Sequence, residues 1–239
     1  CLVGSEMCIR DSGAEMRRLF SFGSSPMRRS PIALVLAAAV LAAPVIAQPG
    51  PGGAGHMEML HGSGTPAAVK AGTYAVEPAH TQVTFSVSHM GISPFAGTFS
   101  GASGTMALDP ANLAATKLSV TIPIASVQTT SSKLSEELVS ADWLDAARFP
   151  TASFTATKVT PLGPEAASIE GTLTLHGVSK PVTIMARFFG AAQNPMSKKD
   201  SIGFLARAQI KRSDFGVAKY VPLVSDETVL VINAAFEKQ

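Results

Sequence analysis

The part of the chain predicted to fold lacks several features that would indicate a particular chemistry. Both cysteines, Cys1 and Cys8, lie near the start, so the remainder offers no disulfide, thiol nucleophile or cysteine metal ligand. Residues 1–47 hold five of the 19 basic and three of the 17 acidic side chains, which leaves 14 of each and no net charge beyond residue 47. Binding of nucleic acid calls for a basic surplus, so no nucleic-acid partner is expected.

Signature motifs of catalysis are also missing. The sequence has no Gly-x-Ser-x-Gly nucleophile elbow, no His-Glu-x-x-His zinc motif and no glycine loop of the kind that cradles phosphate. We therefore expect a binding protein and not an enzyme.

The longest hydrophobic run precedes residue 48 and has the layout of an export signal. The chain opens at Cys1 instead of methionine, so we expect residues 1–26 to be an upstream, non-native or alternative-start segment. A basic stretch at Arg28 and Arg29, an apolar core and a small residue at Ala47 predict a signal peptide over residues 27–47, cleaved after Ala47. The run is shorter than the roughly 20 apolar residues of a membrane span, so a retained anchor is the lesser alternative.

Residues 48–72 are rich in Gly, Pro and Ala without periodicity, which predicts a flexible linker. Within it, His56, Met57, Met59 and His61 bring two imidazoles and two thioethers together, and this donor set could hold copper. The alternative is a solvated linker, because spacing alone supplies no fixed ligand geometry.

Beyond residue 72 apolar and polar residues alternate, the period of a β-strand with one face in an apolar interior. In the first such stretch Val83, Phe85 and Val87 alternate with polar residues, and His89 falls on the apolar side. Similar patterns, separated by turn residues, occur in residues 117–124, 151–159, 169–175, 182–188 and 202–210. Residues 98–108 are read as a Gly-rich strand, and residues 227–236 are apolar on both faces, as in a strand covered on both sides. About eight antiparallel strands predict an all-β fold, either a sandwich or a closed up-and-down barrel.

Residues 131–147 break this pattern. Leu134, Leu138, Trp143 and Leu144 recur at helical spacing with charged residues between them, and Pro150 follows. One or two short amphipathic helices are predicted here, with the single tryptophan facing inward.

Several motifs resemble the YceI-like family and occur in the family's order. They are residues 74–91, the Gly-Thr-Phe of residues 97–99, the Ser-Ala-Asp-Trp-Leu-Asp of residues 140–145 with Phe149-Pro150, residues 171–182, and the Arg-Ser-Asp-Phe-Gly of residues 212–216. Glu77 and Thr81 depart from the family's usual aspartate and serine. The resemblance covers residues 73–239, which we identify as a YceI-like domain.

The resemblance implies an extended, eight-stranded, lipocalin-like antiparallel barrel in a periplasmic protein, often linked to stress responses. It implies that an apolar channel holds a long isoprenoid, an isoprenoid quinone or a polyprenyl chain, as the ligand, with no other cofactor. A carrier of this kind would exchange its cargo with a membrane lipid donor or acceptor. Barrels of this family often pair, so a homodimer is one assembly that the resemblance allows, beside a monomer.

The candidate ligand-binding residues are the large side chains on the inward parity and at the helical insert. They are Phe85, Val87, His89, Phe99, Met106, Leu118, Val120, Ile122, Trp143, Phe154, Leu173, Leu175, Ile184, Phe188, Phe204 and Ile232. The alternative is that these side chains fill the interior completely. Small inward residues favour open space over full packing: Ala152, Ala156, Gly171, Ala186, Ala206 and Ala208.

His89 is the candidate contact for a polar head group, with Trp143, Lys211 and Arg212 as outer candidates. The alternative for His89 is a hydrogen bond to a backbone carbonyl, because buried polar groups find partners. Asp214 is expected to bind local backbone amides or to pair with Arg212.

His80 and His176 lie beside turns and are expected to bind turn backbone. A competing hypothesis is a metal-binding protein, in which His80, His89 and His176 meet as a metal triad.

Overall fold

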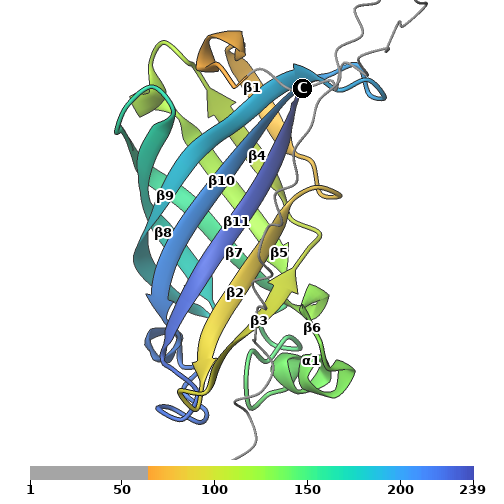
Figure 1. The fold of residues 1–239 in the computed structure, drawn as a ribbon, viewed down its shortest axis with the longest axis vertical. Helices are drawn as coiled ribbons and strands as arrows, with labels where there is room; N and C mark the ends of the chain where they lie inside the picture. The colour runs from red at the N-terminus through yellow and green to blue at the C-terminus, as the bar shows by residue number, and fades with distance from the viewer. Residues whose placement is uncertain (1–63) are drawn as a thin grey trace, which may run out of the picture. The chain divides into compact units, whose positions relative to one another are not determined.

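The computed structural model describes residues 64–239, which form an antiparallel β-barrel (Figure 1). Eight strands make its wall, and pairing between the first and the last of them closes it. In order around the barrel they are β1 (Gly72–Val76), β4 (Ser103–Leu108), β5 (Lys117–Pro123), β7 (Thr151–Pro161), β8 (Ala166–Leu175), β9 (Val178–Gln193), β10 (Asp200–Lys211) and β11 (Glu227–Lys238). The predicted closed eight-stranded barrel is therefore confirmed, and every pairing that closes it lies within this segment.

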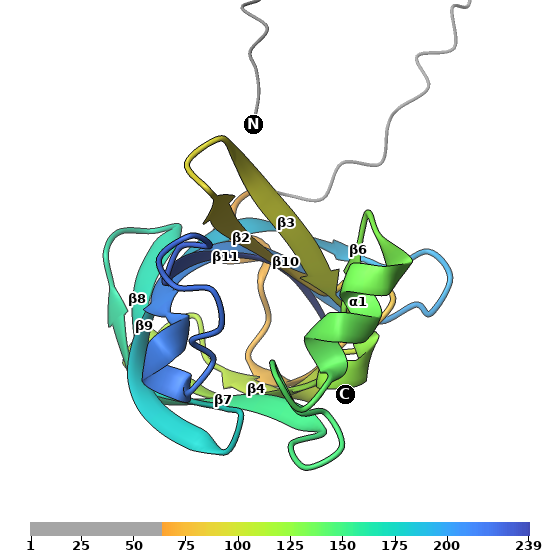
Figure 2. The ribbon, with the colours of Figure 1, turned by 90° about the horizontal axis from the view of Figure 1, so that it is seen from below.

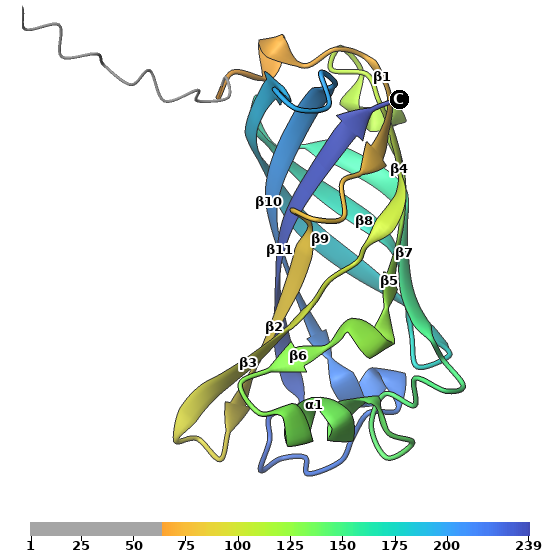
Figure 3. The ribbon, with the colours of Figure 1, turned by 90° about the vertical axis from the view of Figure 1, so that its right-hand side faces the viewer.

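A three-stranded extension leaves the barrel along one side of β11. It consists of β2 (Gln82–His89), β3 (Ser93–Phe99) and the short β6 (Gln128–Thr129). β1 pairs with the end of β11 near Phe236, and β2 pairs with its other half. Figure 3 shows the β2–β3 hairpin projecting at the lower end, the end at which α1 lies.

The single strand expected over residues 98–108 is wrong. The chain turns between β3 and β4, with Gly101 in the left-handed region at φ 67°. In β4 the backbone of Gly104 lies so close to β5 that a Cβ there would be 2.1 Å from the carbonyl oxygen of Ser119. These glycines permit the break and the close approach.

The helical insert is shorter than predicted. α1 spans Ser132–Val139, and Ser131 caps its first turn by accepting a hydrogen bond from the Leu134 amide. Turns follow the helix up to residue 148. Trp143 is buried as expected, in a cluster with Leu138, Leu144 and Val217. Seen from below, α1 covers part of the lower end (Figure 2).

The last residues of the predicted linker pack on the upper end. A 3₁₀ turn, η1 (Pro66–Ala68), precedes Lys70, whose ammonium lies 2.9 Å from the Asp200 carboxylate. The fully buried Tyr74 donates its hydroxyl to the Lys70 carbonyl at 2.6 Å, because a buried hydroxyl needs a partner. The other predicted segments, including the signal peptide and the His56–His61 cluster, lie outside the described residues.

Helices within residues 64–239 are all too short or too polar to cross a membrane.

Candidate functional site

Two apolar cavities lie inside the barrel. The lower one, of about 330 Å³, lies between β2, β8, β10 and the helical insert, and the upper one, of about 230 Å³, lies toward η1 and β4. Five residues line both cavities and form a waist between them: Val83, Ile122, Phe154, Ile184 and Ile232. The two cavities thus lie one after the other inside the barrel, and we call them together the channel.

Side chains do not fill this barrel. Close-packed interiors leave few voids larger than a water molecule, and these cavities measure hundreds of cubic ångströms. The alternative of a completely filled interior is therefore wrong.

The structure brings all of the candidate ligand-binding residues to the walls of the channel, although their contact with a ligand stays a prediction. Phe85, Val87, His89, Phe99, Trp143, Leu173 and Leu175 line the lower cavity, and Met106, Leu118, Val120, Phe188 and Phe204 line the upper one; the remaining candidates form the waist.

Four of the six small inward residues border a cavity. Ala152 and Ala208 border the lower cavity, Ala186 and Ala206 border the upper one, and Ala156 lines neither. Gly171 leaves no open space, because a Cβ there would lie 2.3 Å from the ring of Phe154. The expectation for Gly171 is wrong, since the Phe154 ring occupies the room that it provides.

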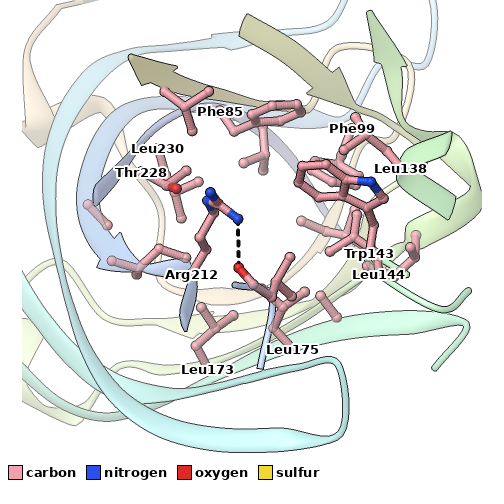
Figure 4. Close-up of a pocket in the computed structure, with 18 of the residues that line it drawn as sticks. Phe85, Phe99, Leu138, Trp143, Leu144, Leu173, Leu175, Arg212, Thr228 and Leu230 are labelled. Carbon is pink, nitrogen blue, oxygen red and sulfur yellow. Dashed lines mark hydrogen bonds between the residues drawn. The ribbon is translucent and has the colours of Figure 1, made fainter. Parts of the chain in front are cut away.

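Arg212 brings a positive charge into the lower cavity. It opens η4 (Arg212–Phe215), is only 6% exposed and lines the cavity. Its guanidinium donates four hydrogen bonds of 2.7–2.9 Å to backbone carbonyls of the loop that leads to β11. The acceptors are Val217, Lys219, Val224 and Ser225. In Figure 4 a dashed line marks one hydrogen bond of the Arg212 guanidinium.

Those four bonds leave one Nη2–H of the five guanidinium donors unused. Within residues 64–239 no carboxylate lies within ion-pair distance of Arg212. Burial lowers the pKa of Arg212, and the nearby charge of Asp226 opposes that shift. The lower cavity therefore combines an apolar wall with one cation that carbonyl dipoles solvate.

Asp226, and not Asp214 as predicted, is the carboxylate that binds a backbone amide here. Its carboxylate accepts hydrogen bonds from the Ser213 amide at 2.8 Å and from the Ser213 hydroxyl at 2.7 Å. These bonds, followed by the charges of Arg212 and Lys211, lower the pKa of Asp226 in spite of some desolvation. Asp214 is exposed and lines an outer groove, so its expected role is wrong.

Trp143 lies opposite Arg212 in the lower cavity (Figure 4). The guanidinium carbon is 5.7 Å from the indole centroid, within cation–π range. The indole N–H donates to Glu137 at 3.0 Å, so it is already used inside the protein. Tyr220 meets the indole edge-on at 5.9 Å between ring centroids.

His89 ends β2 at the mouth of the lower cavity, where it pairs with Val224 in an isolated bridge. It is exposed, and its imidazole makes no hydrogen bond to any described residue. The alternative of a buried histidine bound to a backbone carbonyl is therefore wrong. Lys211 is also exposed but lines the outer groove between β9 and β10, so its candidacy as a head-group contact is wrong.

The three histidines of the proposed metal triad have separate environments. The His80 imidazole bonds to the carboxylate of Glu77, and His176 Nδ1 lies 3.0 Å from the Phe215 carbonyl. His176 thus binds backbone as expected, whereas His80 binds a side chain. No group of three His, Cys, Asp or Glu residues in the described part could hold a metal ion, so the triad is wrong.

Comparison with known proteins agrees with this architecture. The model of the YceI-like domain matches residues 74–236. The chain belongs to the YceI-like family. Protein YceI of Escherichia coli O157:H7 is 40% identical over 157 residues, which cover 66% of this chain and 81% of that protein.

Solved YceI-like structures share the fold. The YceI protein of Campylobacter jejuni is 35% identical, with a TM-score of 0.57 over 64% of this chain and 90% of that one. A polyisoprenoid-binding domain from Saccharophagus degradans, implicated in plant cell wall breakdown, is 13% identical with a TM-score of 0.54, over 71% of this chain and all of that one. At that identity the second likeness concerns the fold alone.

Sequence reasoning missed several residues that line the lower cavity of this YceI-like domain. Thr228 and Leu230 share the inward parity of Ile232, so counting every second residue back from Ile232 along β11 could have found them. No periodic pattern marks Glu137, Tyr220 and Val224, because they reach the lower cavity from the helical insert and from the loop before β11.

Proposed function

We propose that this YceI-like domain binds one long apolar lipid of the isoprenoid class along its channel and carries it without transforming it. The observation that carries the proposal is the pair of apolar cavities that meet at a shared waist inside one closed barrel. Ligand sites in proteins usually measure about 300–1,000 Å³, and the lower cavity alone falls in that range.

An extended hydrocarbon fits this site better than a compact ligand. The two cavities lie one after the other along the barrel, and their walls offer almost only apolar side chains. Each CH₂ group removed from water contributes about 0.8 kcal/mol, so chain length would supply most of the affinity. The polyisoprenoid-binding domain of Saccharophagus degradans, which shares the fold, supports the isoprenoid class.

The head group of this lipid would lie at the lower end, beside Arg212. The unused Nη2–H and the positive charge of Arg212 favour a head group with an acceptor oxygen, such as a quinone carbonyl or a phosphate. Other polar groups of the lower cavity are His89 at the mouth, Thr228 on the wall, and Glu137 and Tyr220 from the helical insert and the loop before β11.

Export, which the sequence predicts, would suit a carrier role. The predicted signal peptide over residues 27–47 would place the domain in the periplasm, between membranes that could act as donor and acceptor. Neither the sequence motifs nor the channel offers a nucleophile with an adjacent base in the described part.

Uptake of an isoprenoid quinone by purified residues 64–239 tests the proposal. Quenching of Trp143, the single tryptophan, reports binding, and extraction gives the stoichiometry. Ala208→Phe puts a ring into the lower cavity, whereas Gln209→Phe puts the same ring on the outer face of β10. We expect about one quinone per wild-type and Gln209→Phe chain and at least tenfold weaker binding to Ala208→Phe. No uptake by the wild-type domain would contradict the proposal.

A further inference from the structure

Two neighbouring loops at the lower end expose large apolar side chains to solvent. The turn between β2 and β3 presents Met90 and Ile92, and the loop before β11 presents Tyr220, Val221 and Leu223. Ile92 is 77% exposed and Leu223 is 64% exposed. We call these five residues the apolar tip.

The apolar tip is one continuous surface at the mouth of the lower cavity. The Met90 amide donates a 2.7 Å hydrogen bond to the Leu223 carbonyl, which joins the two loops, and His89 pairs with Val224 directly behind it. His89 and Tyr220 are both exposed and both line the lower cavity, so the cavity meets solvent beside the tip.

Charge is missing from this part of the molecule to an unusual degree. From Pro78 to Leu108, a stretch that includes β2, β3 and β4, the sequence holds no Asp, Glu, Lys or Arg, and residues 220–225 hold none either. The ammonium of Lys219 lies beside the tip, 5.3 Å from the centre of the Tyr220 ring, and it pairs with Asp142 at 3.0 Å and Glu137 at 3.6 Å. The five side chains of the apolar tip carry no charge themselves, so they can leave water without the high cost of desolvating one.

We propose that the apolar tip docks on a lipid surface, where it places the mouth of the channel against the membrane. Exposed apolar patches of monomeric proteins mark interaction sites, and this one continues into an apolar channel. Tyr220 suits the membrane–water interface, because its ring is apolar and its hydroxyl is polar. That a bound lipid passes between the channel and the membrane rests on the proposed function, but the docking itself does not.

A lipid surface fits the tip better than a protein partner. Steering between proteins uses complementary charges, and the tip offers none to complement. For the same reason docking needs no anionic lipid and changes little with salt, since it depends on buried apolar area.

Co-sedimentation of residues 64–239 with vesicles of phosphatidylcholine tests the docking. This segment closes its own barrel and omits the apolar run before residue 48, which could bind lipid by itself. Ile92→Glu and Leu223→Glu place a charge in the tip. Met196→Glu is the matched control, because Met196 is 89% exposed on the β9–β10 turn at the upper end.

We expect the wild-type domain and Met196→Glu to partition equally onto the vesicles, and Ile92→Glu and Leu223→Glu to partition at least tenfold less. All four proteins should unfold at the same temperature, because the substituted positions are exposed. A loss of partitioning is then due to the tip and not to unfolding. Docking is overturned if the wild-type domain stays in solution, or if all variants sediment alike.

A second readout separates this inference from the proposed function. Isoprenoid quinone added from ethanol should bind the tip variants as tightly as the wild type, while transfer of quinone out of vesicles should slow at least fivefold in the tip variants only. Vesicle binding by a domain that takes up no quinone would keep the docking and contradict the carrier role. If the domain takes up quinone, and quinone leaves the vesicles equally fast with the wild type and the tip variants, the docking is overturned and the carrier role is kept.

Discussion

The guanidinium of Arg212 lies over the indole ring of Trp143, with 5.7 Å between the guanidinium carbon and the ring centroid. This contact joins two loops far apart in sequence, the one after α1 and the one before β11. Arg212 also binds four carbonyls of the loop before β11, so one side chain fixes the polar end of an otherwise apolar channel. The lower wall of the channel therefore depends on this residue for its shape.

Replacement of Arg212 should destabilise the domain strongly. Arg212→Met leaves four carbonyls without their donor, and each unsatisfied buried acceptor costs about 1–3 kcal/mol, reduced where water can enter. We expect the free energy of unfolding in urea to fall by about 3 kcal/mol or more. Lys211→Met, at the exposed neighbouring position, is the control and should change it by less than about 0.5 kcal/mol. Equal effects of the two substitutions would contradict the account of Arg212.

Acid should weaken the loop that Asp226 supports. Hydrogen bonds from Ser213 hold the pKa of Asp226 below its ordinary value of 3.8, so the carboxylate stabilises the fold above that pH. This contribution is lost as the pH falls through the lowered pKa. Asp226→Asn should therefore be less stable than the wild type at neutral pH, and the two should converge as the pH falls below the lowered pKa of Asp226. Chemical unfolding over a pH series measures this, and parallel curves at all pH values would argue against it.

Removal of the histidine at the channel mouth should change the choice of head group and not the binding of the tail. His89→Ala takes an exposed imidazole from the rim and leaves the apolar wall intact. We expect tail-dependent affinity within about twofold of the wild type, with altered preference between quinone and polyprenyl phosphate of the same chain length. Competition between the two lipids measures the preference, and an unchanged ratio would assign His89 no part in recognition.

Affinity should rise with chain length and then reach a plateau once the channel is filled. Each added CH₂ contributes about 0.8 kcal/mol only while it enters the channel. Ala206→Phe fills part of the upper cavity and should move the plateau to a shorter chain. Leu205→Phe on the outer face should leave the plateau unchanged. Titration with isoprenoid quinones of increasing length measures both, and the same plateau in Ala206→Phe would place the tail elsewhere.

Much of the fold could be predicted because its signal is periodic. Alternation in β2, β7 and β10 identifies inward residues such as Phe85, Phe154 and Ala206, and a closed barrel turns this parity into a channel wall. The same rule could not tell a filled interior from an open one. Gly171 illustrates the limit, because whether its missing side chain makes space depends on the rotamer of Phe154 across the strand pair.

The polar end of the channel could not be predicted in the same way. Arg212, Glu137 and Tyr220 reach it from non-repetitive segments, whose course depends on tertiary contacts and not on a local period. Asp226 was missed for this reason, since nothing local distinguishes it from Asp214 as the partner of Ser213.

The most direct test of the central claim is mass spectrometry of an organic extract from the protein purified without detergent from the cells that produce it. We predict one long isoprenoid lipid per chain, retained by the wild type and lost from Ala208→Phe. Extracts of the wild type that hold no isoprenoid or other long-chain lipid, from protein that also fails to take up isoprenoid quinone, would contradict the claim that the channel is a lipid site.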